Sequence, residues 1–238
     1  ILGIDPKKLI YAAPETLEDC FQTIHNIIME IRELDEDTPI VIAYDSIAVS
    51  PSKSEYEAEG FDGNNMVGAV RAKSTGACLR KINPILRMKK VALIVINQIR
   101  NKVGVLYGDP TTMAAGGKSL EFYLGVNLRT SAPKSGRIVD ENKRIVGIKG
   151  EVKNTKNKVT VPFQTCEYEL RYDEGLSSHY GLLGQLVLDG LVTKDGAWYS
   201  YEGTKFQTKT FIDRFFIDEK FAPLRSLVGI NNKESIDE

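Results

Sequence analysis

The hydrophobic pattern of the chain centres on two short apolar runs, at Pro39–Ser46 and Val91–Gln98. Each run is rich in β-branched residues and ends abruptly in polar ones, which is typical of a strand buried on both faces of a parallel sheet. We expect both strands to stop at the same edge. Ligands of open α/β sheets bind at the carboxyl ends of the strands, so the pattern places four polar side chains where a ligand site would form: Asp45, Ser46, Asn97 and Gln98.

These strand-end side chains suit a nucleotide. An aspartate just past a strand can hold Mg²⁺ through water, and a strand-end amide can sense a phosphate. We interpret Asp45 and Gln98 as parts of a nucleotide site. The alternative, which this feature alone leaves open, is that Asp45 merely caps the loop that follows.

Helical periodicity predicts a first helix after Pro14, preceded by a short strand at residues 9–12. Thr16 and Asp19 have the spacing of a capping box. The apolar residues that follow recur at helical spacing and predict a stripe facing the core: Leu17, Phe21, Ile24, Ile27, Ile28 and Ile31.

A second predicted helix runs from about residue 65 to Met88, and Pro84 should kink or end its regular part. Lys73, Arg80 and Arg87 are spaced seven residues apart on it, which brings them onto one face. This basic stripe could contact phosphates. A charged face exposed to solvent is the alternative.

Two loops leave the sheet edge. The polar segment Pro51–Asn65 is long for a compact domain, and such loops are usually functional or disordered. The segment Ile99–Ala115 combines Arg100 and Lys102 with glycines and carries Tyr107 near its tip. Basic residues, glycines and an aromatic in one loop favour a nucleic-acid contact.

The segment from residue 120 to 172 predicts a short helix followed by strands. The helix covers residues 120–124, and strands are expected at 126–130, 137–139, 145–152 and 165–172. Lys156 and Lys158 follow, two residues apart, so they share a face if the segment is extended. Such a pair suits a polyphosphate, with surface decoration as the alternative.

The sequence changes character from about Leu176. A helix at residues 180–188, a hairpin around Trp198 and an amphipathic helix with three phenylalanines follow. We expect these aromatic residues to form a small core. The predicted organisation is therefore a large α/β core at residues 1–174 and a small α/β C-terminal domain at residues 175–238.

Composition indicates the cellular compartment of the protein but does not identify its binding partners. The 238 residues carry 31 Lys and Arg against 32 Asp and Glu, and this balance neither favours nor excludes nucleic acid. The three cysteines, Cys20, Cys78 and Cys166, are far apart, which argues against zinc and disulfides and favours a reduced, cytoplasmic setting. The sequence contains no apolar run long enough to span a bilayer.

One apparent phosphate-binding motif is rejected. Residues 114–119, AAGGKS, resemble the end of the pattern G-x-x-x-x-G-K-[ST]. The first glycine would fall at Thr112, and we expect no strand running directly into the turn. The sequence holds no other candidate for a complete phosphate loop.

Several separate phrases, in order, resemble one family. They are NQIRNKVGVLYGDPTT, GGKSLEFY, KNTKNKVTVPF, LRYDEGLS and GAWYSYEG, and together they are similar to the bacterial RecA recombinases, in a divergent form. The likeness runs from Leu2 to about Gly203. It implies a RecA-like ATPase core with a mostly parallel central sheet flanked by helices. It also implies an ATP- and Mg²⁺-dependent protein of recombination, repair and the SOS response. Such a protein forms helical filaments on single-stranded DNA and exchanges strands with double-stranded DNA.

The resemblance also implies roles for individual residues. Asp45 would hold Mg²⁺ through water with Ser46 beside it, and Gln98 would sense the γ-phosphate and bias the attached loop. Lys156 and Lys158 would reach the γ-phosphate bound by a neighbouring subunit and act catalytically as an arginine finger does, and Tyr172 would lie near the adenine. Pro51–Asn65 and Ile99–Ala115 correspond to the two DNA loops. Phe122 would link subunits cooperatively, and the DNA contacts would be Lys73, Arg80, Arg100, Asn101, Lys102, Tyr107, Gly116 and Gly117.

Departures from the family pattern leave an alternative open. The phosphate loop and the glutamate that activates water should precede Ile1, so we expect the chain by itself to bind ATP poorly and hydrolyse it hardly at all. A related helicase or signalling ATPase would lack the second-loop phrase and GAWYSYEG, which this chain has. The remaining alternative is a non-hydrolysing DNA-binding or filament-modulating fragment.

Overall fold

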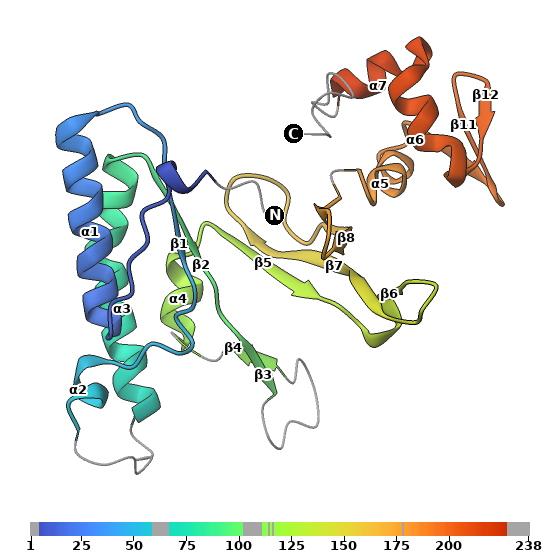
Figure 1. Ribbon diagram of the computed structural model, residues 1–238. Helices are drawn as coiled ribbons and strands as arrows, with labels where there is room; N and C mark the ends of the chain where they lie inside the picture. Colours follow the sequence, from blue (N-terminus) through green and yellow to red (C-terminus); the bar gives the residue numbers. More distant parts are fainter. Residues whose placement is uncertain are drawn as a thin grey trace. The chain divides into compact units, whose positions relative to one another are not determined.

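The computed structural model describes residues 5–58, 67–101, 111–113, 115, 117–177 and 179–227. The chain divides into two units, one at Ile10–Leu124 and the other combining Ile1–Leu9 with Gly125–Glu238. Each unit is described by itself. Most of the helices and strands are labelled in Figure 1.

The first unit contains two long helices that lie side by side, α1 (Leu17–Leu34) and α3 (Val67–Met88) (Figure 1). Thr16 caps α1, because its hydroxyl accepts a hydrogen bond from the Asp19 backbone N–H at 3.2 Å, but the reciprocal backbone bond of the predicted capping box is not formed among the described residues. The same hydroxyl donates to the Asp19 carboxylate at 2.6 Å. The predicted stripe faces the core, since four of its residues are buried, namely Leu17, Phe21, Ile24 and Ile28.

The two apolar runs form parallel strands, β1 (Ile40–Tyr44) and β2 (Val91–Val95), that stop at one edge as predicted. Burial on both faces is not observed. Val41 and Ile94 are 68% and 53% exposed, whereas Ile40 and Tyr44 are buried. Side chains alternate across a strand, and α1 and α3 supply the core partners of only one face in the described part of this unit.

The second helix is longer in its regular part than predicted. α3 continues past Pro84 to Met88, so the proline does not end it. The chain then turns through Lys90, which has a left-handed φ of 53°, into β2.

The two loops contain secondary structure that periodicity did not reveal. Helix α2 (Lys53–Tyr56) begins with a capping box of Ser52 and Glu55. Strands β3 (Ile99–Asn101) and β4 (Thr111–Met113) pair antiparallel and lead to helix α4 (Gly117–Tyr123). A short strand therefore does precede the AAGGKS turn, contrary to expectation, although Thr112 still replaces the first glycine of the phosphate loop.

The predicted strand at residues 9–12 is absent. No strand covers these residues, and their apolar side chains are exposed, with Tyr11 at 85%. A strand needs a neighbour for its backbone hydrogen bonds, and none of the described strands pairs with this segment.

The second unit is built on an antiparallel sheet in the order β5-β7-β8-β9, with β6 pairing β7. The strands predicted at residues 137–139 and 145–152 are present and pair antiparallel as a hairpin, β6 with β7. The elements of this part are the 3₁₀ helices η1 (Pro6–Lys8) and η2 (Lys134–Gly136) and the strands β5 (Val126–Ser131), β6 (Arg137–Val139), β7 (Ile145–Asn157), β8 (Thr165–Arg171) and β9 (Gly175–Leu176).

The end of the chain has its own apolar cluster. As predicted, its aromatic residues form a core, including Phe206, Phe211, Phe215 and Phe221. The predicted boundary after residue 174 stays a prediction. The elements here are α5 (Leu182–Leu188), β10 (Thr193–Asp195), β11 (Trp198–Tyr201), β12 (Thr204–Phe206), α6 (Thr208–Ile217), η3 (Glu219–Phe221) and α7 (Ala222–Leu227).

The predicted α/β class is confirmed by this mixture of helices and sheets. Parallel pairing occurs between β1 and β2, and the described pairs of the larger sheet are antiparallel. Within the described residues, no helix combines the length and apolarity that crossing a bilayer requires.

Candidate nucleotide and DNA site

The carboxyl ends of β1 and β2 meet through backbone hydrogen bonds that continue past both strands. The Ile96 N–H donates to the Tyr44 carbonyl at 3.0 Å, and the Ile47 N–H donates to the Ile96 carbonyl at 3.1 Å. Asp45 lies in the chain between Tyr44, which ends β1, and Ile47, and Asn97 directly follows Ile96. The predicted gathering of strand-end residues at one edge is therefore observed.

Asp45 has the surroundings that a water-mediated Mg²⁺ ligand needs. Its side chain is exposed, and within the described residues its carboxylate has no hydrogen bond or ion pair. Mg²⁺ usually keeps several waters and takes only one or two protein carboxylates beside phosphate oxygens, so one accessible carboxylate fits the ion. No group of three His, Cys, Asp or Glu side chains suited to a metal occurs in the described part of the chain.

Ser46 differs from its neighbour because it is buried. The peptide bond between Asp45 and Ser46 is cis. The Ser46 carbonyl accepts from the Val49 N–H at 3.3 Å and from the Ser50 hydroxyl at 3.4 Å. These contacts fix the loop that leaves β1 beside Asp45.

The second strand end is organised by Asn97. Its side-chain Oδ1 accepts a hydrogen bond from the Gln98 backbone N–H at 2.9 Å, and its Nδ2 donates to the Ala115 carbonyl at 2.9 Å. The Gln98 side chain is exposed and thus accessible to a ligand. Sequence reasoning named Asn97 as a strand-end residue but gave it no role, because a bond to Ala115 joins residues far apart in the sequence.

Tyr44, the last residue of β1, lies in a desolvated part of the core. Tyr44, Cys20 and Cys78 belong to the core or pack against it. Burial raises the pKa of Tyr44 and the pKa of the Cys78 thiol above their usual values. Tyr44 and Cys78 are therefore neutral at ordinary pH and add no charge to the strand ends.

The paired lysines belong to the other unit, at the end of β7. Lys156 lies in the strand opposite Asn127 of β5. Lys158 is the first residue after the strand, and its N–H donates to the Gly125 carbonyl at 2.9 Å. Asn157, between them, accepts from the Val159 and Thr160 N–H groups at 2.8 and 3.0 Å. The lysines therefore sit where the strand passes into a tight turn.

Tyr172 directly follows β8 and lies beside the opposite end of β7. Its N–H donates to the Val146 carbonyl at 2.9 Å, and its side chain is 57% exposed. From Val146 to Lys156 a strand advances about 33 Å, which is longer than a nucleoside triphosphate. Tyr172 and Lys156 therefore lie at opposite ends of β7.

Three of the described DNA candidates are exposed basic side chains. Lys73 and Arg80 lie on α3 and Arg100 on β3, all exposed. Asn101 ends β3, and Gly117 begins α4. The remaining candidates, Lys102, Tyr107 and Gly116, lie outside the described residues.

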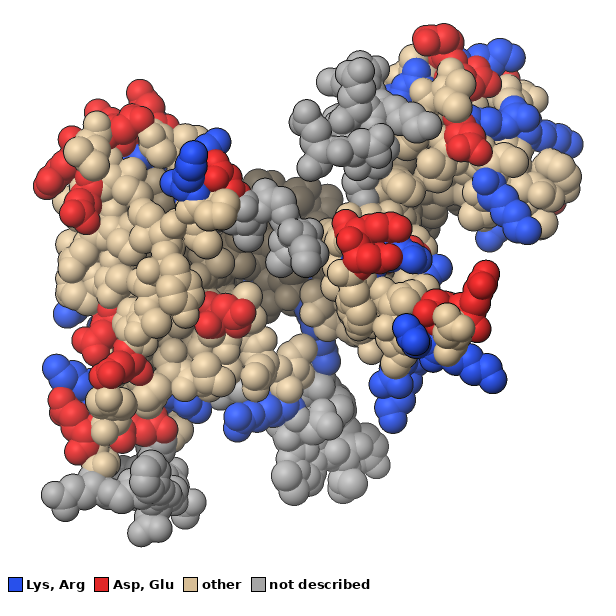
Figure 2. Space-filling view, viewed as in Figure 1, with Lys and Arg blue, Asp and Glu red and all other residues tan. Residues whose placement is uncertain are grey.

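The surface near α2 is acidic. Figure 2 shows red side chains gathered there, and the Lys53 backbone N–H binds the Glu18 carboxylate at 2.8 Å. The Tyr56 hydroxyl donates to the Glu15 carboxylate at 2.7 Å, and this bond raises the pKa of Tyr56. A DNA phosphate would be repelled by this surface.

Phe122, the predicted subunit contact, is 72% exposed on α4. Its ring packs edge-on against Tyr123, with the centroids 5.5 Å apart. A large exposed aromatic side chain is suited to an intermolecular contact.

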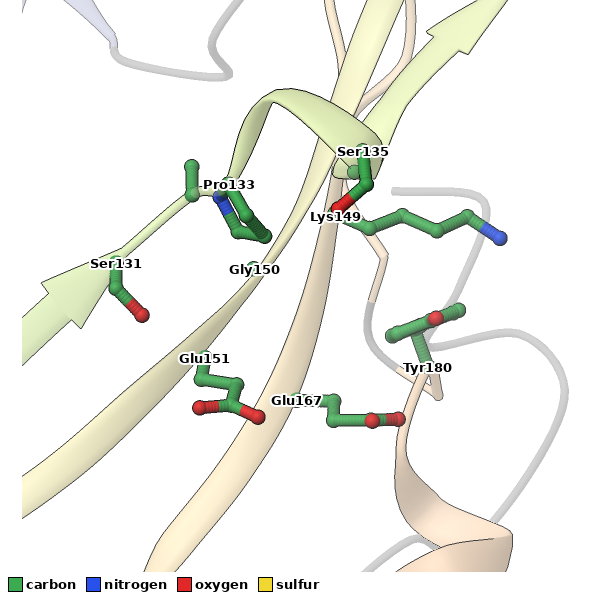
Figure 3. A pocket seen from close by; sticks show the side chains of 10 residues that line it. Ser131, Pro133, Ser135, Lys149, Gly150, Glu151, Glu167 and Tyr180 are labelled. Atoms are coloured by element: carbon green, nitrogen blue, oxygen red, sulfur yellow. The ribbon is translucent and has the colours of Figure 1, made fainter.

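A pocket of about 570 Å³ opens on the sheet of the second unit. Figure 3 shows Glu151 and Glu167 on adjacent strands, with Tyr180 near Glu167 and Lys149 extending beside the Tyr180 ring. Lys149 pairs with Glu169 at 3.1 Å, and that hydrogen bond raises the pKa of Lys149. The predicted nucleotide residues do not line this pocket.

Comparison with known proteins gives consistent matches. Residues 1–177 match the family described as the RecA N-terminal domain. The chain is 37% identical over 221 residues to Protein RecA of Pseudomonas fluorescens, covering 91% of this chain and 58% of that protein. The identity to Protein RecA of Thermus aquaticus is 36% over 200 residues, covering 84% of this chain and 55% of that protein. For Protein RecA of Streptomyces coelicolor it is 34% over 249 residues, covering 100% of this chain and 62% of that protein. The chain thus spans less than two thirds of the length of each relative.

Proposed function

Because the chain belongs to the RecA family, we propose that the protein of which it is part is a DNA-stimulated ATPase of homologous recombination and repair. In this proposal copies of the protein assemble into a helical filament on single-stranded DNA. The filament pairs this DNA with a duplex and exchanges strands. The observation that carries the proposal is the meeting of Asp45, Asn97 and Gln98 at the ends of two parallel strands.

The strand-end residues support binding of ATP with Mg²⁺. Mg²⁺ neutralises phosphate charge when bound, and Asp45 would hold it through water. Ser46 fixes the loop beside that carboxylate. Gln98 is free to approach the terminal phosphate because Asn97 binds its backbone and leaves its side chain exposed.

The separation of Tyr172 from the paired lysines supports a nucleotide shared between copies. We propose that Lys156 and Lys158 of one copy approach the γ-phosphate held by the strand ends of another. Two ammonium groups there would stabilise the negative charge of the transition state. Tyr172 would serve a different nucleotide, near the adenine.

We propose that single-stranded DNA contacts the exposed basic residues of α3 and the second loop: Lys73, Arg80 and Arg100, with Asn101, Lys102, Tyr107, Gly116 and Gly117. The acidic surface near α2 implies that any contact by the first loop uses backbone N–H groups. Phe122 would contact the neighbouring copy.

We propose that residues 175–238 form a small C-terminal domain, because they contain an apolar cluster of their own. The cytoplasm is the proposed location, since all three cysteines are free thiols.

The first prediction tests the lysines in the full-length protein. Without Lys156 the γ-phosphate loses a cation in the transition state, a contribution worth roughly 1,000-fold or more when an arginine finger supplies it. We expect Lys156→Ala to abolish the ATP hydrolysis that single-stranded DNA stimulates, measured as phosphate release.

Lys153→Ala is the matched control, since Lys153 is exposed on the same strand and has no proposed role at the phosphate. It should keep most of the stimulated rate. Unchanged stimulation in Lys156→Ala would refute the interface role. Absence of stimulation in the unaltered protein would refute the proposed ATPase function.

A further inference from the structure

The segment that carries the predicted second DNA loop leaves β2 and returns as a hairpin. β3 and β4 pair with Ile99 opposite Met113 and Arg100 opposite Thr112. A two-stranded hairpin is at best marginally stable by itself. What holds its base therefore decides how firmly the loop is attached to the strand end.

The base of the hairpin is closed by a side chain. Continuing the β3–β4 register by two residues puts Asn97 opposite Ala115, and the Asn97 Nδ2 donates to the Ala115 carbonyl at 2.9 Å. If the β3–β4 ladder were two residues longer, a backbone N–H would make this contact. Here the side-chain amide of Asn97 makes it instead. Because Ala115 is buried in the core of the unit, this contact ties the hairpin to a fixed point.

The same amide also holds the residue that would sense the phosphate. Its Oδ1 accepts from the Gln98 N–H at 2.9 Å. One side chain therefore joins the outgoing end of the hairpin at Gln98 to the returning end at Ala115. The returning end leads directly into α4, which carries Phe122.

We propose that Asn97 is a positioning residue that makes a change at Gln98 reach both ends of the hairpin and the start of α4 together. The inference rests on the proposed function, since it concerns how ATP strengthens binding of single-stranded DNA. Without the hydrogen bond to Ala115, a movement of Gln98 would shift only the outgoing strand of the hairpin and would not reach the returning strand or α4. ATP and DNA would then bind independently.

The experiment compares the affinity of the full-length protein for labelled oligo-dT with and without a non-hydrolysable ATP analogue, by fluorescence anisotropy. Coupling between two sites typically changes affinity 5- to 150-fold, and we expect a ratio in this range. Asn97→Asp keeps the shape and the acceptor for Gln98 but removes the donor to Ala115. Its affinity ratio should fall to about one. Asn97→Ala removes both bonds and should behave likewise.

Asn26→Asp is the matched control, because it makes the same chemical change on the exposed face of α1. It should keep the full ratio. A lower melting temperature of Asn97→Asp with an unchanged ratio would show a merely structural role and overturn the inference. A ratio of one in the unaltered protein would instead contradict the proposed function, so the two failures are distinguishable.

Amide hydrogen exchange gives a second measurement. Asn97→Asp should leave the Gln98 amide protected, since the acceptor remains, whereas Asn97→Ala should make it exchange faster. Equal exchange in both variants would overturn the assignment of the two bonds.

Discussion

At the scale of single residues, Tyr44 makes an unusual contribution to the core. Its side chain is buried against Phe21, with the ring centroids 5.9 Å apart. Its hydroxyl is also buried and, although the Cys20 and Ser50 side chains lie near it, it makes no hydrogen bond of ordinary geometry within the described residues. A buried polar group without a partner costs free energy.

We therefore predict that Tyr44→Phe leaves the free energy of unfolding unchanged or raises it by up to about 1 kcal/mol. Urea denaturation measures this directly. Tyr44→Ala is the comparison, because it also removes the ring and should cost about 3 kcal/mol or more. A loss above about 1 kcal/mol in Tyr44→Phe would mean that the hydroxyl is hydrogen-bonded after all.

The sequence identified the strand-end residues because short apolar runs that end abruptly in polar residues form a local pattern. Asp45 and Gln98 could be named from that pattern alone. The role of Asn97 could not, because its bond to Ala115 depends on where the hairpin returns. Single-residue chemistry is local, whereas hydrogen-bond partners depend on the whole fold.

At the scale of elements, Arg32 connects the ends of both long helices with the starts of both strands. Its Nε and Nη2 donate to the Lys89 carbonyl at 3.0 and 2.9 Å, and its Nη1 donates to the Thr38 carbonyl at 2.7 Å. Lys89 follows α3 and leads into β2, and Thr38 leads into β1. One planar guanidinium thus holds together the two segments that lead into β1 and β2, the strands whose carboxyl ends carry the candidate site.

Replacing this guanidinium should destabilise the first unit. Hydrogen bonds to charged groups contribute about 1.5–3 kcal/mol, so we expect Arg32→Ala to lower the free energy of unfolding by about 2 kcal/mol or more. Arg32→Lys should restore only part of the lost free energy of unfolding, because one ammonium group cannot donate to both carbonyls as the planar guanidinium does. Arg87→Ala, at an exposed position of α3, should change stability by less than about 0.5 kcal/mol. Equal midpoints for Arg32→Ala and Arg87→Ala in urea would contradict this role.

The errors of element prediction have physical causes. Pro84 was expected to kink or end its helix, and the helix continues beyond it, since the packing of α3 against α1 and α4 outweighs one lost hydrogen bond. The strand at residues 9–12 was predicted from composition, but a strand exists only with a partner. Burial of both faces of β1 was inferred from apolar residues alone, which do not specify what covers them.

At the scale of the whole molecule, near-equal numbers of acidic and basic residues conceal an uneven surface. Acidic side chains gather near α2 (Figure 2), while Lys73, Arg80 and Arg100 are exposed on other elements of the same unit. The net charge of −1 therefore does not describe the potential that DNA would meet. The arrangement, which composition cannot reveal, decides whether a phosphate backbone is attracted.

This uneven surface leads to a prediction about salt. Each phosphate neutralised on a single strand contributes about 0.7 to the slope of log K against log salt. If Arg100 contacts one phosphate, Arg100→Ala should weaken binding of oligo-dT by the full-length protein and reduce the slope by about 0.7. The slope isolates the ionic contact from general effects on folding, because a misfolded fraction lowers affinity equally at every salt concentration.

Lys134→Ala is the matched control, since it removes one exposed positive charge from η2, which has no proposed DNA contact. Its slope should equal that of the unaltered protein, because only cations that displace counterions from the strand enter the slope. A reduced slope in both variants would mean that the DNA is attracted by the positive charge of the surface as a whole and not by a specific set of contacts. An unchanged slope in Arg100→Ala would remove Arg100 from the proposed contacts and leave Lys73 and Arg80 as the described candidates.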